Sequence, residues 1–186
     1  SHLYSSQFDK DRTKVVKKAI SAGVKTILLP NIASNHTKGM LDLCAEFPNN
    51  CFPMMGLHPC DAKENTLSSE LNHVEEELEK GNYIAVGEIG LDLYWDRSTL
   101  AIQEKAFIHQ IELAKTYNLP IAIHVRDSFS EAIEIIERLN NKNLRGVFHC
   151  FTGNVEDAKR VINLEGFYLG VGGVLTFKNS ALDDTI

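Results

Sequence analysis

Short apolar, β-branched segments alternate along the chain with longer amphipathic stretches, and this alternation restricts the fold more than any other feature. The apolar segments lie at residues 26–30, 52–59, 83–92, 120–127, 146–151 and 167–173. Most stretches between them place apolar residues at helical spacing, as with Leu71, Val74 and Leu78. Strands joined in this way pair in parallel, because a parallel connection needs a crossover of about a dozen residues or more. The sequence therefore predicts an α/β fold with a parallel sheet.

Polar residues gather where these predicted strands end, which decides between two α/β architectures. They are His58, Glu88, Asp92, His124, Arg126, Asp127 and His149. A (β/α)₈ barrel collects its site from many strand ends, whereas a doubly wound sheet draws most of it from two neighbouring strands. No glycine-rich dinucleotide-binding turn follows the first apolar segment. We therefore predict a TIM-type (β/α)₈ barrel and, because no linker interrupts the chain, a single domain over residues 1–186.

Composition excludes several classes of protein. With 44% apolar and 24% charged residues among 186, the chain is neither disordered nor fibrous. It has no run of ~18 apolar residues that could span a membrane and no secretory signal, so we expect a cytoplasmic protein. The four cysteines form no C-x-x-C pair, so we expect free thiols. A net charge of −6 argues against broad coating of nucleic acid, but not against a nuclease that holds phosphate through metal ions.

Strand alternation indicates which of the polar side chains point into the barrel. In the segment 120–127, His124 and Arg126 share a face with Ala122, opposite an aliphatic face that must contact helices. In the segment 83–92, alternation aligns Glu88 with Val86, and we expect Glu88 to point inward at the mouth of the barrel.

His149 lies opposite Phe148 and Cys150 on the next predicted strand, so it also faces inward and Cys150 does not. Glu88, His124 and His149 would then converge from three strands. A carboxylate with two imidazoles is a ligand set for a divalent metal ion, although each histidine alone could be a hydrogen-bonded structural residue.

The remaining polar residues keep more than one interpretation. His58 could be a metal ligand, an acid or base, or a capping donor. Arg126 could clamp a phosphate through its fork of donors or pair with a nearby carboxylate. Asp92 and Asp127 could act as loop or helix caps.

An ordered series of motifs carries a family resemblance over essentially the whole chain. The opening SHLYSSQFDKDR is followed by GLHP, GEIGLDLYW, QEKAF, LPIAIHVRD and HCFTG. With these motifs in this order and at this spacing, the chain resembles the TatD family of metal-dependent deoxyribonucleases, within the amidohydrolase-like barrel hydrolases.

The resemblance implies two divalent ions, Mg²⁺, Mn²⁺ or Zn²⁺. His2 would be the second histidine of an H-x-H motif, Glu88 the carboxylate that bridges the ions, and His124 and His149 the ligands of the second ion. His58 would lie close to the substrate phosphate. Arg126 would help to hold it. The first histidine of H-x-H and the family's strand-8 aspartate have no counterpart in residues 1–186, so we expect a barrel that lacks part of strand 1, strand 8 and the C-terminal helices.

The expected activity is metal-dependent hydrolysis of phosphodiesters in nucleic acid, with single-stranded DNA as the substrate of a DNase or exonuclease. Glu88, His58 and Arg126 would be catalytic, and no membrane or obligate protein partner is expected. The same residues could instead serve a deacylase or amidohydrolase acting on an ester or amide such as aminoacyl-tRNA, which would release an acid or amine. A third alternative is a binding protein without activity, which would bind no divalent metal.

Overall fold

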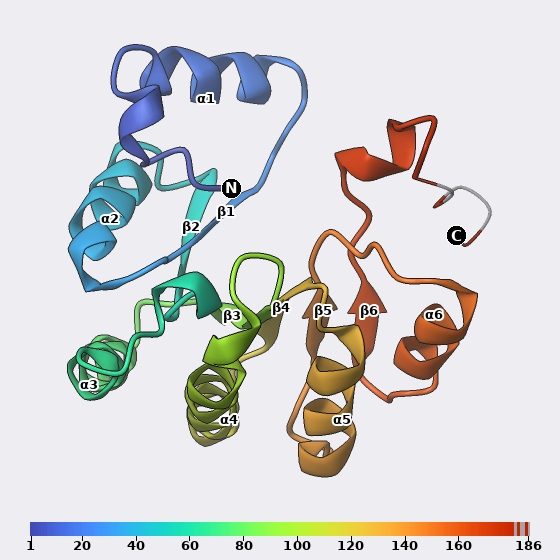
Figure 1. Cartoon of the computed structure of the whole chain (residues 1–186). Helices are drawn as coiled ribbons and strands as arrows, with labels where there is room; N and C mark the ends of the chain where they lie inside the picture. The colour runs from blue at the N-terminus through green and yellow to red at the C-terminus, as the bar shows by residue number, and fades with distance from the viewer. Residues whose placement is uncertain (181, 183–184, 186) are drawn as a thin grey trace.

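The computed structural model describes residues 1–180, 182 and 185 of the chain. In this part, six parallel strands form one sheet in the order β1-β2-β3-β4-β5-β6 (Figure 1). They are Ile27–Pro30 (β1), Cys51–Met55 (β2), Ala85–Asp92 (β3), Ile121–Arg126 (β4), Gly146–Phe148 (β5) and Phe167–Leu169 (β6). Each lies within or next to a predicted segment, so the α/β class and the parallel sheet are confirmed.

Helices connect each strand to the next. The α-helices are Arg12–Ser21 (α1), Thr37–Glu46 (α2), Leu67–Glu79 (α3), Leu100–Thr116 (α4), Phe129–Leu139 (α5) and Val155–Ile162 (α6). Short 3-10 helices span Ser6–Phe8, Ser34–His36, Pro59–Asp61, Arg97–Thr99 and Gly173–Thr176. The predicted helices correspond to α3 to α6, whereas α1 and α2 are not predicted, although Met40 and Leu43 of α2 recur at helical spacing and are buried. None of the helices in the described part of the chain is long and apolar enough to cross a bilayer.

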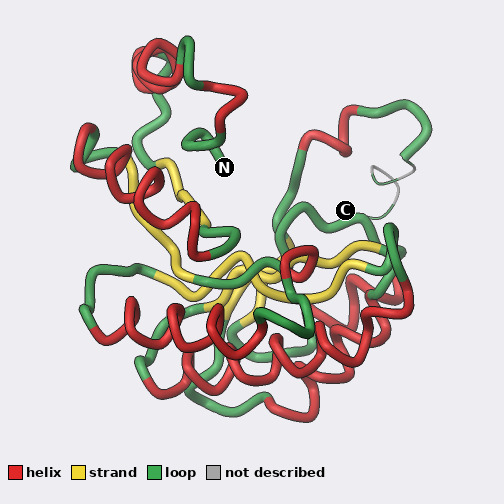
Figure 2. Tube along the Cα trace, turned by 60° about the vertical axis from the view of Figure 1, so that its left-hand side comes forward, coloured by secondary structure: helices red, strands yellow, loops and turns green. Residues whose placement is uncertain are grey.

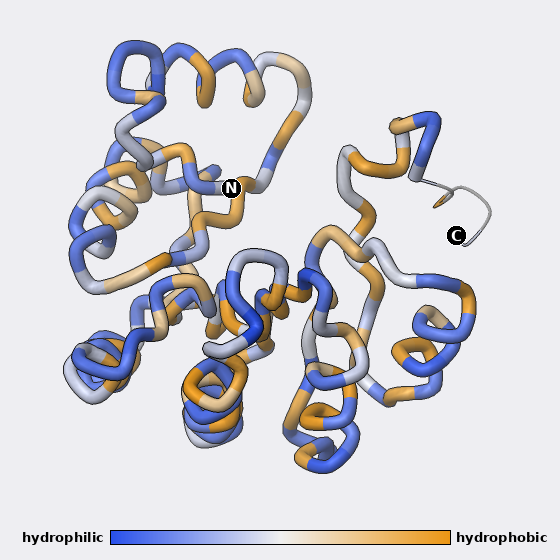
Figure 3. Tube along the Cα trace, viewed as in Figure 1, coloured by the Kyte–Doolittle hydropathy of each residue, from blue (hydrophilic) through white to orange (hydrophobic). Residues whose placement is uncertain are grey.

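The main core lies between the sheet and helices α2 to α6, which gather along one face of the curved sheet (Figure 2). Phe107 and Ile111 of α4 are fully buried there, in one cluster with Val86, Ile89 and Ile123 of the sheet. Each covering helix combines hydrophobic and hydrophilic residues along its length (Figure 3), as expected of a helix with one buried side. This layer holds the strands in place and positions their carboxyl ends.

The opposite, inner face of the sheet is lined by smaller groups. Met54, Ala85 and Ala122 form a separate cluster there. They line a cavity of about 710 Å³ that Glu88 and His149 also line. Ionisable and apolar residues therefore share the inner face.

Several strands end earlier than predicted, and two of these ends affect the site. β2 ends at Met55 and β5 at Phe148, so His58 and His149 follow their strands instead of belonging to them. Cys150 adopts a left-handed backbone conformation with φ of 46°, which is incompatible with a continuing strand. The backbone N–H of His149 nevertheless donates to Ile123 of β4 at 2.8 Å, so the loop stays attached to the sheet.

Candidate metal centre

An irregularity in β3 places Glu88 on the inner face. Gly87 of β3 is paired with Ala122 of β4 and Ile89 with Ile123, so Glu88 is an extra residue without a partner. Such a β-bulge interrupts strict alternation and redirects a side chain. Gly87 allows the close packing required, because a Cβ at this position would lie 2.8 Å from the Cβ of Ala122.

The bulge corrects one step of the sequence analysis. Val86 was expected to share a face with Glu88, but it is fully buried in the core on the helix side. Glu88 instead contacts histidines on the inner face and is 5% exposed. Glu88 points toward the inner face, as expected. The β-bulge, and not strict alternation along the strand, gives the side chain this direction.

His124 is held between two carboxylates. Its Nδ1 lies 3.1 Å from Oε1 of Glu88, and its Nε2 lies 2.9 Å from Oδ2 of Asp92. Burial alone would lower the pKa of His124, but the hydrogen bonds and negative charges of Glu88 and Asp92 outweigh burial and raise it. Asp92 is 3% exposed. It contacts the site residue His124 directly and also accepts from the backbone N–H of Tyr94, as a loop cap would.

His2 approaches the other oxygen of Glu88. Its Nε2 lies 3.2 Å from Oε2 of Glu88, and its Nδ1 lies 2.9 Å from the hydroxyl of Tyr4. Tyr4 donates a short hydrogen bond to the carbonyl of Pro30 at the end of β1. Arg12 anchors the same segment by donating to the carbonyls of Leu3, Tyr4 and Ser5.

Tyr4 and Asp92 are the outer hydrogen-bond partners of His2 and His124, and they determine which nitrogen of each ring faces Glu88. The only hydroxyl hydrogen of Tyr4 goes to Pro30, so Tyr4 accepts from Nδ1 of His2. A carboxylate can only accept, so a protonated His124 donates both to Asp92 through Nε2 and to Glu88 through Nδ1, in line with its raised pKa. If the nitrogen that faces Glu88 loses its proton while the outer nitrogen keeps its bond to Tyr4 or Asp92, the ring directs a lone pair toward Glu88, which is the arrangement of metal-ligating histidines with outer hydrogen-bond partners.

The electrostatic surroundings keep Glu88 ionised. Burial opposes ionisation and would raise the pKa of Glu88. Hydrogen bonds with His124 and His2, together with the charges of His124 and His149, outweigh burial and hold the pKa well below its usual value. A carboxylate that is ionised at neutral pH and surrounded by imidazoles is suited to bind a cation.

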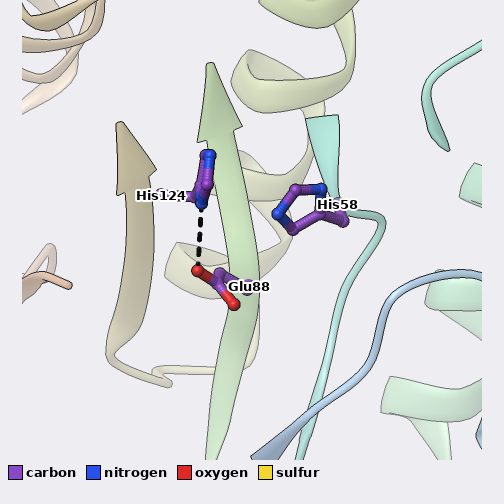
Figure 4. Close-up of side chains that lie close together, drawn as sticks. All are labelled: His58, Glu88 and His124. Carbon is purple, nitrogen blue, oxygen red and sulfur yellow. Dashed lines mark hydrogen bonds and ion pairs between the residues drawn. The ribbon is translucent and has the colours of Figure 1, made fainter. Parts of the chain in front are cut away.

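His58 differs from His2 and His124 in its hydrogen bonding. Its Nδ1 accepts from the backbone N–H of Cys60 at 3.2 Å, so it caps the 3-10 helix as an acceptor and not as the capping donor considered above. Burial first, and the neighbouring charge of His124, lower the pKa of His58 to about 4. The neutral ring then carries its proton on Nε2. His58, Glu88 and His124 each offer a ligand atom, and these atoms lie within 4.8 Å of one another (Figure 4).

His149 and Arg126 lie further from Glu88. Nε2 of His149 is 3.9 Å from Oε1 of Glu88, and half of the His149 side chain is exposed. Burial and the nearby positive charges lower the pKa of His149 in spite of Glu88. Arg126 stacks on Tyr94, with its guanidinium carbon 3.6 Å from the ring centroid. Within the described part of the chain it pairs with no carboxylate, contrary to one of the two interpretations.

The structure thus brings His2, His58, His124 and His149 around Glu88 and leaves Arg126 outside the cluster. The sequence does not single out Tyr4, and it leaves Asp92 either as a site residue at the strand end or as a cap. Their positions give a usable signal, because Tyr4 is two residues from His2 and Asp92 is four residues from Glu88 on the same strand.

Comparison with known proteins identifies the family. The whole chain, residues 1–186, matches the family described as TatD related DNase. It is 34% identical over 180 residues to the uncharacterized metal-dependent hydrolase YabD of Bacillus subtilis, and the alignment covers 97% of this chain and 69% of that protein. It is 32% identical over 172 residues to the 3'-5' ssDNA/RNA exonuclease TatD of Escherichia coli K12, and this alignment covers 92% of this chain and 65% of the relative.

A solved structure extends the likeness to the fold. The crystal structure of YJJV, a TatD homologue from Escherichia coli K12, matches with a TM-score of 0.88 and 29% identity over 99% of this chain and 71% of that chain. This likeness confirms the predicted TIM-type barrel fold. The chain spans about two thirds of the length of the curated relatives it matches. With its family profile, its relatives and its fold in agreement, the chain belongs to the TatD family.

Proposed function

We propose that this protein is a metal-dependent nuclease that hydrolyses phosphodiesters of single-stranded nucleic acid as an exonuclease. The observation that carries the proposal is the arrangement of imidazoles about Glu88. His2 approaches Oε2, whereas His124 and His149 approach Oε1. A carboxylate with separate imidazoles at its two oxygens is suited to bridge two cations.

The donor set fits divalent ions. His2 and Glu88 would hold one ion, and Glu88, His124 and His149 would hold the second. Ions bound there would supply Lewis-acid activation of the phosphoryl group and of an attacking water. Two or more imidazoles favour Zn²⁺ or Mn²⁺, while phosphate chemistry favours Mg²⁺.

His58 supplies a hydrogen bond in this proposal. It is neutral at pH 7 because its pKa is lowered to about 4, and its Nε2 carries the proton. This N–H can donate to a phosphoryl oxygen or to the leaving oxygen of the substrate. Asp92 and Tyr4 are positioning residues, since each holds the outer nitrogen of a ligand histidine.

The family supports nucleic acid as the substrate. One relative bears the name 3'-5' ssDNA/RNA exonuclease, and single strands fit a protein whose net charge of −6 cannot coat a duplex. The four cysteines are free, as the sequence predicts, which supports the cytoplasmic location that we propose.

The test is hydrolysis of an end-labelled single-stranded DNA by the full-length protein, with Mg²⁺ or Mn²⁺ and with excess EDTA. We expect stepwise release of mononucleotides that EDTA abolishes, and no release by Glu88→Gln. A metal-loaded, folded protein that leaves DNA intact but releases an acid from an ester or amide would replace the nuclease with a carbonyl hydrolase.

A pair of substitutions tests His58 separately. His58→Ala should lower the hydrolysis rate about 10²- to 10⁴-fold without changing metal affinity. His58→Gln restores an N–H donor at a similar position, so part of the rate should return. Loss of metal binding in both variants would instead assign His58 as a ligand.

A further inference from the structure

The loop that follows β3 exposes two aromatic rings beside an arginine. Tyr94 is 51% and Trp95 is 73% exposed, and their rings meet edge to face with centroids 4.8 Å apart. The guanidinium carbon of Arg126 lies 3.6 Å from the Tyr94 ring centroid and 5.6 Å from that of Trp95. We call Tyr94, Trp95 and Arg126 the aromatic platform.

The backbone under the platform is fixed although its rings are exposed. Oδ1 of Asp92 accepts from the N–H of Tyr94 at 3.1 Å, and the N–H of Leu93 donates to the carbonyl of Arg126 at 2.9 Å. Beyond Trp95, the side chain of Asp96 caps the 3-10 helix that follows. Rings that contribute little to the core, yet are presented on an anchored loop, are pre-organised for binding.

The platform adjoins the metal centre directly. Asp92 connects them, because its Oδ1 holds Tyr94 and its Oδ2 holds His124. Arg126 is two residues beyond His124 on β4. Among the residues that the structure describes, no acceptor occupies the guanidinium donors of Arg126.

We propose that the aromatic platform is a nucleotide-binding subsite, in which a base of a single strand stacks on Trp95 and Arg126 binds a neighbouring phosphate. This inference rests on the proposed nuclease function and identifies where the substrate lies. Aromatic rings bind any base through its π face, and Arg126 provides paired donors for phosphate. The platform would therefore hold single strands with little preference for sequence.

A nucleic acid fits better than a protein surface for two reasons. The platform is continuous with the proposed centre of phosphodiester hydrolysis through Asp92. It also presents Arg126, which pairs with no carboxylate among the described residues, on a chain of net charge −6, and this cation favours an anionic ligand at this position.

Residues 1–186 contain a single tryptophan, Trp95, so the part of the emission change that Trp95→Phe removes reports on the platform. We would titrate the full-length protein in EDTA with a short oligothymidylate and record tryptophan emission. Stacking should quench the emission saturably. An abasic oligonucleotide with the same number of phosphates should bind more weakly and leave the emission unchanged. Binding of oligothymidylate without any change in emission would overturn the proposal.

Substitutions measure the contribution of the ring. Trp95→Ala should weaken binding of a labelled oligothymidylate, followed by anisotropy, about 5-fold to about 150-fold, which corresponds to ~1–3 kcal/mol for one stacked base. Trp95→Phe should restore much of the affinity, since Phe keeps a π face. Phe177→Ala is the matched control, because Phe177 is an exposed aromatic outside the platform, and it should bind as the unmodified protein does.

Arg126→Ala should weaken binding and lower the dependence of log affinity on log salt by about 1, the change for one lost phosphate contact. An unchanged salt dependence would remove Arg126 from the subsite. The outcomes separate the two proposals. DNA hydrolysis with no response of Trp95 retains the nuclease and overturns the platform, whereas quenching without hydrolysis retains the platform and overturns the nuclease.

Discussion

The two faces of the sheet bury different kinds of side chain. On the helix side, Val86, Ile89 and Ile123 are fully buried against α4, and their contacts are apolar. On the inner side, Glu88 and Asp92 are 5% and 3% exposed and are surrounded by imidazoles and backbone donors. Buried charges are tolerated only where such partners are complete. We therefore expect damage to the helix side to lower stability and damage to the inner side to remove chemistry.

The largest effect should come from Glu88→Gln. It keeps the size of the side chain but removes the negative charge that the imidazoles face, so hydrolysis of single-stranded DNA should fall at least about 10³-fold. The free energy of unfolding, measured by urea denaturation in EDTA, should change little by comparison. Full activity in this folded variant would show that the inner face does not carry the chemistry.

The converse change is Phe107→Ala on the helix side. Phe107 is fully buried, so its truncation should lower the free energy of unfolding by ~3–5 kcal/mol. Urea denaturation measures this loss, with Phe107→Leu as a milder control. The folded fraction should still bind Mn²⁺ with unchanged affinity. A large loss of metal affinity per folded molecule would contradict the division between the two faces.

Asp92→Asn tests one hydrogen bond on the inner face, the bond that orients His124. An amide in place of the carboxylate weakens the fixed orientation of His124, and metal affinity should fall about 10- to 100-fold. Calorimetric titration with Mn²⁺ measures the change. Asp96→Asn, at an exposed capping carboxylate, is the matched control and should leave metal affinity unchanged. Equal affinities in all three proteins would remove Asp92 as a positioning residue.

The smallest effect concerns pH. The pKa of His124 is raised above its ordinary 6.5, so its protonated form stabilises the metal-free protein below pH 6.5. This stabilisation should be lost as pH rises through the raised pKa, while metal affinity should increase because the competing proton leaves. Urea denaturation in EDTA and metal titration, both from pH 6 to 9, test the two opposite trends. His124→Gln should flatten the stability trend.

Strand alternation predicts the face of the sheet on which the site residues lie, but for Glu88 the reason it gives is wrong. Alternation placed Ile123 toward the helices and His124 toward the inner face, as the structure has them. For Glu88 it reached the right face through an alignment with Val86 that is wrong. A bulge depends on the pairing of β3 with β4, so alternation within one strand cannot reveal it.

The sequence by itself determined the alternation of strands and helices, the parallel sheet and the chemical groups at the strand ends. These follow from the periods of helix and strand, which are set by backbone geometry over a few residues. Only the tertiary structure decided how those groups are oriented and which partners they contact. Tyr4 and Asp92 hold the outer nitrogens of His2 and His124, so that the other nitrogen of each ring faces Glu88, while the backbone N–H of Cys60 leaves the proton of His58 on Nε2. Contacts such as His2 with Glu88 join residues 86 positions apart, and such partners are chosen by packing in space and not by local periodicity.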